Sequence, residues 1–451
     1  MVQAFYTPFF PGGVQILAGP RYLLLGMSGF FVACAGGPRI GSVTPADIPA
    51  LKAQAAQQPS NAQVRFRLAA ALMAAGRCDT AVVVANAGQT RAPGEALGPM
   101  VVGGCQEKDG RYDLAFATYT AFAARYPQAR GVAAVRALAQ LALRTQAAQT
   151  AQLALAREST LTTLAPEPST IAVLPMTIAG DSSFQPLSRG LAELLMSDLA
   201  MVRSLRLLER VQIGALLDEL KLGQSARADP GTAARVGRLL RAERMVQGVA
   251  SITQNGPVRM SATVVRGDGN VRSGGGAQAN GTFKQLLDLE KQLVFGLATE
   301  LGIQLTEAER QRILRQGPKN LAAFLAYSNG LEALDRGDYR AAAAAFSAAV
   351  RADPSFQQAQ QQQQAAEAAP AVQASPGDVV TVVEAVAEMT TPTEPATTGA
   401  LNQATAELTP IITQPLQNGS NLIGSNATTE SQGITSVVQA SGILRVIFHK
   451  P

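Results

Sequence analysis

The sequence predicts an α+β protein with several domains, in which helical repeats flank an α/β domain and a disordered C-terminal tail follows. Three observations support this prediction. A period of 34 residues runs through the N-terminal part of the chain, and a segment with alternating strand and helix patterns follows it. From residue 357 onward, Gln, Ala, Thr, Ser and Pro dominate the composition, which is typical of disorder. A chain of 451 residues is long enough for two or three domains.

Residues 1–33 are interpreted as a signal peptide. Arg21 precedes an uncharged run over 22–38, which is short and rich in glycine for a membrane span. The run contains "FVAC", and a cysteine after a small residue resembles the bacterial lipobox, in which the cysteine is lipidated and becomes the new N-terminus. We therefore expect a lipid on Cys34, and Ala35 in place of aspartate implies placement at the outer membrane. A cleaved signal without lipid, a membrane anchor and a buried core helix are the alternatives.

Cysteine usage adds a second expectation. A lipid on Cys34 leaves Cys78 and Cys105 as an even pair in an oxidising periplasm. A disulfide between them is one hypothesis. Two buried free thiols are the other, and the sequence gives both equal weight.

A period of 34 residues marks helical units between residues 34 and 157. Proline recurs at this spacing, and "GRCDTA" returns one period later as "GRYDLA". Period and motif resemble the tetratricopeptide repeat, in which a glycine ends the first helix, a small residue lets two helices approach closely and a proline ends the second helix. The residues concerned are Gly76, Ala81, Pro93, Gly110, Ala115 and Pro127. Residues 128–157 are expected to form a closing helix pair, and generic helical packing is the alternative interpretation of the whole segment.

A third copy of the motif lies far downstream, within residues 306–356. It reads "YSNGLEALDRGDYRAAAAAFSAAVRADP", and Thr306 with Glu309 forms a capping box for the helix before it. The residues expected to pack the repeat are Gly330, Gly337, Ala342, Phe346 and Pro354. Such repeats stack into surfaces that bind peptides or partner domains, so these segments indicate protein binding.

Between the repeats, after a linker at 158–168, residues 169–305 have the pattern of an α/β domain. Apolar β-branched runs indicate buried strands, and leucines at helical spacing indicate the helices that cover them. Asp229 and Pro230 are expected to begin one helix, and Asn255-Gly256 is a favoured turn between two strands. The expected elements are a strand at 169–176, a helix at 185–203, a strand at 205–210, a helix at 211–222, a helix from Pro230 to Arg241, hairpin strands at 245–253 and 258–265, a weak strand at 271–275 and a helix at 282–301.

The segment 207–251 carries a family resemblance. It reads "LLERVQIGALLDELKLGQSARADPGTAARVGRLLRAERMVQGVAS". Together with "IAVLPM" and "LSRGLAELLMSDLA" before it, it resembles the CsgG-like family of curli-transport outer-membrane lipoproteins, and is similar to the related FlgO and TolB amino-terminal domains. The resemblance covers roughly residues 169–305. It implies a non-enzymatic α/β domain that builds or supports assemblies at the outer membrane, and the best-known subtype forms a ring-shaped export channel.

Two features depart from the family pattern. Arg241 stands where relatives usually have a helix-ending glycine, and arginine does not adopt a positive φ cheaply. The channel subtype also inserts two amphipathic hairpins per subunit into the membrane, and each spanning strand needs about 9–11 alternating residues. Residues 257–280 offer at most one such hairpin, whose second arm, "VRSGGGAQAN", is rich in glycine. The sequence therefore favours a scaffold over a pore.

The sequence offers little for catalysis, cofactors or metals. His449 is the only histidine, which removes the usual base of a nucleophilic triad and most zinc sites. No glycine-rich phosphate loop follows a strand, and "GDGN" at 267–270 lacks the further carboxylates of a calcium loop. A net charge of +5 does not favour nucleic acid as a partner. We therefore expect no enzyme activity, no cofactor and no metal site.

The tail is expected to consist of two parts. Residues 357–440 bury too little apolar surface to offset the entropy of ordering, so they are predicted to be disordered. Residues 441–451 contain the β-prone stretch "GILRVIFHKP". This stretch is interpreted as a docking strand that adds to a sheet edge, or alternatively as a loose end.

These observations predict a lipoprotein held by a lipid anchor at the periplasmic face of the bacterial outer membrane. Its repeats would recruit other proteins of the cell envelope, so it would act as a non-enzymatic scaffold or assembly factor. The alternative, from the resemblance, is an oligomeric CsgG-like subunit of a curli-type export channel. Homo-oligomerisation is a further expectation of the resemblance.

Overall fold

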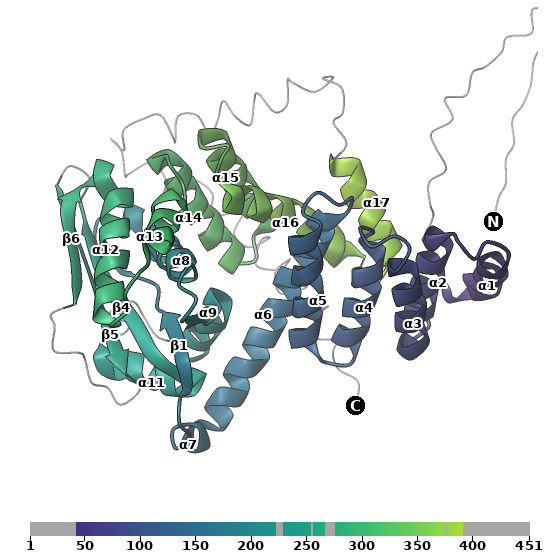
Figure 1. Cartoon of the computed structure of the whole chain (residues 1–451), viewed down its shortest axis with the longest axis horizontal. Coiled ribbons are helices and arrows are strands. Elements are labelled where there is room, and N and C mark those ends of the chain that lie inside the picture. Colours follow the sequence, from purple (N-terminus) through teal and green to yellow (C-terminus); the bar gives the residue numbers. More distant parts are fainter. Residues whose placement is uncertain (1–41, 222–228, 254–255, 267–275, 376, 391–451) are drawn as a thin grey trace, which may run out of the picture. The chain divides into compact units, whose positions relative to one another are not determined.

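The computed structural model describes residues 42–221, 229–253, 256–266, 276–375 and 377–390 (Figure 1). The expected signal peptide, Cys34, the tail from residue 391, the docking strand at 441–451 and the weak strand at 271–275 lie outside the described residues. The described part has an α+β architecture in which helices predominate.

The N-terminal helices form successive hairpins. They are α1 (Ile48–Gln57), α2 (Ala62–Ala74), α3 (Cys78–Gln89), α4 (Leu97–Lys108), α5 (Tyr112–Arg125) and α6 (Val132–Ala156). Helix α2 packs against α3, α4 against α5, and α5 against α6. Asn61 begins α2, because its side-chain oxygen accepts hydrogen bonds from the backbone N–H groups of Gln63 and Val64.

Each glycine that was expected to end the first helix of a repeat adopts a left-handed conformation. The φ angle is +73° at Gly76, +73° at Gly110 and +78° at Gly337. Around the first of these, the N–H of Arg77 donates to the Leu72 carbonyl at 2.9 Å, and the N–H of Gly76 donates one turn back as well. The same pair of bonds recurs at the other two glycines. Glycine is required here because it adopts this backbone without steric cost.

The expected packing residues lie where the hairpin helices cross. Ala81, Ala115 and Ala342 are fully buried. A Cβ on Gly330 would lie 2.5 Å from the ring of Phe346, so only glycine fits there. Pro93, Pro127 and Pro354 follow the ends of α3, α5 and the later helix α15 (Tyr339–Ala352). The helical hairpins are therefore present, and their assignment to the tetratricopeptide family stays a prediction.

The downstream hairpin belongs to the same core as the N-terminal hairpins. It consists of α14 (Leu321–Asp335) and α15, and is followed by α16 (Gln357–Ala374) and α17 (Val379–Thr390). Helix α16 packs against both α15 and α6. As a result, buried side chains between Val43 and Ala142 and between Ala323 and Val386 form one hydrophobic cluster. Two repeat segments that are separate in sequence thus form one helical unit.

The expectation of a closing helix pair over 128–157 was wrong. Residues Val132–Ala156 form the single helix α6, because no glycine or proline interrupts them. The second helix expected beside it is replaced by α16, which packs against α6 and follows the α/β domain in the sequence.

The prediction of disorder was also wrong for the first part of the tail, because residues 357–374 and 379–390 are helical. Ala359, Ala366 and Val372 of α16 are buried in the helical core. The glutamines between them make polar contacts with α6. For example, Gln140 Nε2 donates to Gln362 Oε1 at 2.5 Å. A low-complexity segment therefore orders here because its alanines and glutamines match the surface of α6.

The α/β domain is inserted between α6 and α14. Its elements are β1 (Glu167–Val173), β2 (Thr177–Gly180), α8 (Leu187–Leu199), β3 (Arg206–Leu207), α9 (Arg210–Glu219), α11 (Pro230–Leu240), β4 (Ala242–Ile252), β5 (Pro257–Arg266), β6 (Ala277–Thr282) and α12 (Leu286–Glu300). The short α7 (Glu158–Leu161) lies in the expected linker, and α13 (Glu307–Arg315) connects to α14. The strand order is β3-β1-β4-β5-β6, with β2 beside β4. Strands β1 and β4 are parallel, whereas β4, β5 and β6 are antiparallel neighbours.

Side chains of β1 alternate between two hydrophobic layers. Ile171 and Val173 belong to the layer that α8 and α12 cover. Ala172 and Leu174 belong to the opposite layer, which α9 and α11 cover. This alternation is the ordinary period of a strand that is buried on both faces. Helix α12 lies over the sheet in Figure 1, where it contacts β5 and β6.

Helix α6 is shared by the helical unit and the α/β domain. Its first half, up to Ala142, lies in the helical core, and Ala151 and Ala154 near its end lie in the layer under α9 and α11. The order of strands and helices in the domain was correctly predicted, except that β2 and β6 were not expected. Arg241 does not shift the end of α11: it takes the position after the helix with a φ of +53°.

Candidate functional site: the helical unit and its junction with the α/β domain

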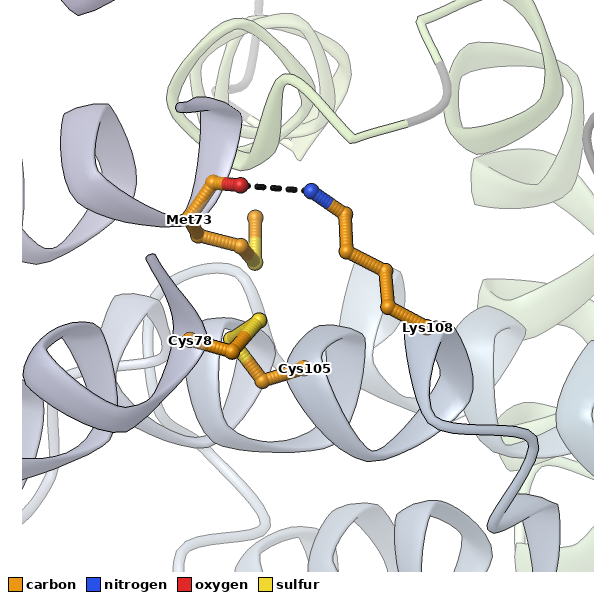
Figure 2. Close-up of a disulfide and its surroundings, with 4 residues drawn as sticks. All are labelled: Met73, Cys78, Cys105 and Lys108. Atoms are coloured by element: carbon orange, nitrogen blue, oxygen red, sulfur yellow. Dashed lines mark hydrogen bonds between the residues drawn. A yellow bond between two sulfur atoms is a disulfide. The ribbon is translucent and has the colours of Figure 1, made fainter. Parts of the chain in front are cut away.

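A disulfide joins the first two complete hairpins of the helical unit. Cys78 at the start of α3 is bonded to Cys105 near the end of α4, across a sequence separation of 27 residues (Figure 2). Beside it, Lys108 Nζ donates to the Met73 carbonyl at the end of α2 at 2.5 Å, in addition to the backbone N–H of Gly76. The disulfide and the lysine therefore hold α2, α3 and α4 together at one end of the hairpins.

An open cavity of about 320 Å³ lies next to the disulfide. It is lined by Cys78, Asp79, Val82, Val102, Cys105, Gln106, Asp109 and Arg111. These side chains provide two carboxylates, one guanidinium and two valines, and none is a base or nucleophile poised for catalysis. This lining suits contacts with a polar segment of another protein better than enclosure of a small molecule.

Glu107, a half-buried acid near the end of α4, faces Tyr119 of α5. The ring of Tyr119 on α5 occupies the space beside Gly103, where a Cβ would lie 2.3 Å from the ring carbons. Burial raises the pKa of the Glu107 carboxyl to about 7, and a hydrogen bond from Tyr119 acts in the opposite direction. Burial also raises the pKa of Tyr119 well above its ordinary value, with the charge of Glu107 as the next cause. The ring of Tyr119 thus packs α5 closely against α4.

The junction between the helical unit and the α/β domain centres on Asp335, the last residue of α14. Arg210 Nη1 donates to both carboxylate oxygens of Asp335, at 2.8 and 2.7 Å. Arg189 Nε donates to the same carboxylate at 2.6 Å. Arg144 on α6 donates to the backbone oxygen of Asp335 at 2.6 Å and to the Tyr339 hydroxyl at 3.1 Å. Arginines from α6, α8 and α9 thus converge on one end of α14.

Inside this junction, Arg189 and Arg210 are paired with the carboxylates of Asp335 and Glu193. The Arg210 side chain is 11% exposed, and its Nε contacts Glu193 Oε2 at 3.0 Å. Burial would raise the pKa of Asp335, but the charge and hydrogen bonds of Arg210, followed by those of Arg189, keep this pKa below its ordinary value. Burial would lower the pKa of Arg210, but Asp335 and then Glu193 raise it. Arg210 and Asp335 therefore remain charged when they pack together.

A second group of titratable side chains lies between α8 and α12. Asp198 is 1% exposed and Glu290 is fully buried. Lys291 Nζ lies 2.5 Å from Asp198 Oδ2 and 3.3 Å from Glu290 Oε2. Burial raises the pKa of Asp198 to about 6 against the charge of Lys291. Burial, and then the charge of Asp198, raise the pKa of Glu290 well above its ordinary value.

This acid pair is too enclosed to serve an external substrate. No partner for Asp198 was expected from the sequence, and Glu290 was missed. A signal was present, because Glu290 follows Leu286 by four residues and precedes Leu293 by three, and so occupies an apolar stripe of α12. An acid at a core position of this kind predicts a buried carboxyl group.

The described residues contain no group of three or more His, Cys, Asp or Glu side chains that would hold a metal ion. Among the same residues, no helix is both long enough and apolar enough to cross a membrane. The strongest polar constellations in the described part therefore join helices to one another.

Comparison with known proteins identifies one part of the chain. The family described as "Curli production assembly/transport component CsgG" matches residues 137–281. This range begins inside α6 and ends in β6, so it includes most of the shared helix. No match was found among curated proteins or among solved structures. Residues 137–281 of this chain form a CsgG-like domain.

Proposed function

We propose that this chain is a non-enzymatic scaffold or assembly factor of the bacterial cell envelope, working in the assembly or transport of secreted subunits. The match of residues 137–281 to a family of curli assembly and transport components carries this proposal. The helical unit, which has one continuous core, would present surfaces to other envelope proteins. A lipid on Cys34 would hold the chain at the periplasmic face of the outer membrane.

The way in which the CsgG-like domain is inserted supports the scaffold role. The domain leaves the helical unit through α6 and returns to it through α14, and the Asp335 junction ties the two together. Such a construction presents two binding units in a defined relation within one chain. The polar groups of the junction and of the acid pair are spent on internal contacts, which supports a role without catalysis.

The alternative is an oligomeric export-channel subunit, which the transport function in the family's description favours. The two proposals differ in stoichiometry. The full chain would be extracted from membranes in mild detergent and its mass measured by light scattering. A monomer or dimer supports the scaffold, whereas a closed ring of many subunits would refute it and support the channel.

The anchor has its own test. Full-length chain expressed with radiolabelled palmitate should incorporate label and fractionate with outer membranes, whereas a Cys34→Ser variant should do neither. A Cys78→Ser variant is the matched control and should keep the label. Label that persists in Cys34→Ser, or is absent from the unaltered chain, would refute the anchor.

A further inference from the structure

The last helix of the described chain occupies a surface of the N-terminal hairpins. Helix α17 contacts α2, α4 and α6, and in Figure 1 it lies beside α4. These three helices are neighbours in the unit, because α4 contacts both α2 and α6. We name this surface of α2, α4 and α6 the inner face. A segment more than 200 positions later in the sequence thus lies on it.

The contact is apolar and has the period of a helix. Val379, Val382 and Val386 are 6%, 3% and 2% exposed, and they repeat at intervals of three and four residues. Val383 continues the stripe. Its Cγ1 lies 3.4 Å from the position of a Cβ on Gly131, the residue that precedes α6. This pattern is that of an amphipathic helix seated in an apolar groove.

Helix α17 depends on this contact for its own structure. Its twelve residues contain five valines and two threonines, which have low helix propensity. A free segment of this length and composition does not form a stable helix in water. Docking on the inner face and folding of α17 are therefore one event.

The connection to α16 allows α17 to leave without disturbing the rest of the unit. Gly377 has a φ of +85° between the two helices. Asp378 begins α17, since its side chain accepts from the N–H of Thr381 at 3.1 Å. Helix α16 is held independently through its contacts with α6 and α15. Release of α17 therefore leaves the contacts of α16 with α6 and α15 in place.

We propose that the inner face is a docking site for an amphipathic helix with a stripe of branched apolar side chains, and that α17 fills this site until such a partner segment replaces it. The chemistry of the partner follows from that of the helix now seated there. The inference rests on the proposed recruiting role of the helical unit. It names the surface that recruits and the kind of segment that is recruited.

The test uses the full chain and a fluorescein-labelled peptide of residues 378–390, followed by fluorescence anisotropy. In the full chain, Val382→Asp with Val386→Asp would undock α17. The peptide should bind this variant at least tenfold more tightly than it binds the unaltered chain. The control is Thr381→Ser, which keeps the hydroxyl that donates to Asp378 and does not alter the valine stripe, so it should leave the weak binding of the unaltered chain unchanged. A variant that loses no more helical circular dichroism than the twelve residues of α17 account for, and that fails to bind the peptide, would overturn the proposal.

A second measurement keeps the proposal testable if the double variant does not fold. A protease site placed between Ser375 and Asp378 in the full chain allows α17 to be severed after folding. Excess unlabelled 378–390 peptide should then displace the severed segment, which would elute separately on size exclusion. Retention of the severed segment at saturating peptide would overturn the proposal. Peptide binding is read directly in both experiments, so a negative result is distinct from a failure of the membrane or mass measurements.

Discussion

The buried acid pair makes the stability of the α/β domain depend on pH. Glu290 is fully buried, and its pKa is raised well above the ordinary value of 4.5. The folded protein therefore holds a proton on this carboxyl that the unfolded chain releases above about pH 4.5. The stability from this group is complete below that pH and is lost as the pH rises towards the folded pKa.

The perturbation is Glu290→Gln, which mimics the protonated acid. Glutamine keeps a hydrogen-bond donor for Asp198, so the titration of Asp198 is common to both proteins and cancels. One proton difference changes the free energy of unfolding by about 1.4 kcal/mol for each pH unit. Relative to the unaltered chain, Glu290→Gln should therefore gain stability as the pH rises above about 4.5, by at most about 1.4 kcal/mol for each pH unit.

The assay is urea unfolding followed by circular dichroism at pH 5, 6 and 7. The change of the difference with pH is the readout, because a constant offset from replacing a carboxyl by an amide does not affect it. Asp288→Asn is the matched control: the side chain lies on the same helix but is exposed, so its difference should stay flat. A flat difference for Glu290→Gln would refute the assignment of a raised pKa to the buried pair.

Three further changes test other parts of the structure. Arg210→Met should lower the free energy of unfolding by about 3 kcal/mol because it leaves the Asp335 junction incomplete, whereas Arg206→Met, whose side chain is 68% exposed, should cost less than about 1 kcal/mol in the same urea titration. Gly103→Ala should destabilise by about 1–3 kcal/mol because of the adjacent tyrosine ring, and Gly214→Ala, which has open space around it in α9, should stabilise by about 0.5–1 kcal/mol in thermal melts; equal effects would contradict the packing described. Reduction of the α3–α4 disulfide, which closes a loop of 27 residues, should lower stability by about 2–4 kcal/mol, and a variant with both cysteines replaced by serine should show no response to reductant.

Local rules predicted the parts of the fold that depend on neighbouring residues. The left-handed glycines, the small residues between hairpin helices and the Asp229 cap each reflect a constraint within a few positions of the chain. Thr232 N–H donates to the Asp229 carboxylate at 2.7 Å, as a residue of that type before Pro230 requires. The capping box of Thr306 and Glu309 is confirmed for the same reason.

Features that depend on distant residues were not predictable in this way. Arg144, Arg189 and Arg210 are ordinary surface residues in sequence, and only the insertion of the α/β domain brings them to Asp335. The prediction of disorder for the glutamine-rich helix α16 failed for a related reason. Its composition indicates disorder in isolation, and it is ordered because α6 offers a complementary surface. Arg241 shows a third case, where tertiary contacts hold a φ of +53° that local preference disfavours.

The interrupted core of the helical unit has a consequence for how the protein folds. Where α6 packs against α16, Gln140 forms a hydrogen bond with Gln362, which lies 222 positions later in the sequence. A chain that emerges from its N-terminus first, from a ribosome or a translocation pore, completes α1 to α6 and then waits for the whole CsgG-like domain before α16 arrives. Non-local pairing of this kind is slow and leaves apolar helix surface exposed in the meantime. The alanine-rich side of α6 is therefore a surface of the nascent chain that needs protection by a chaperone, and truncations before α16 should aggregate.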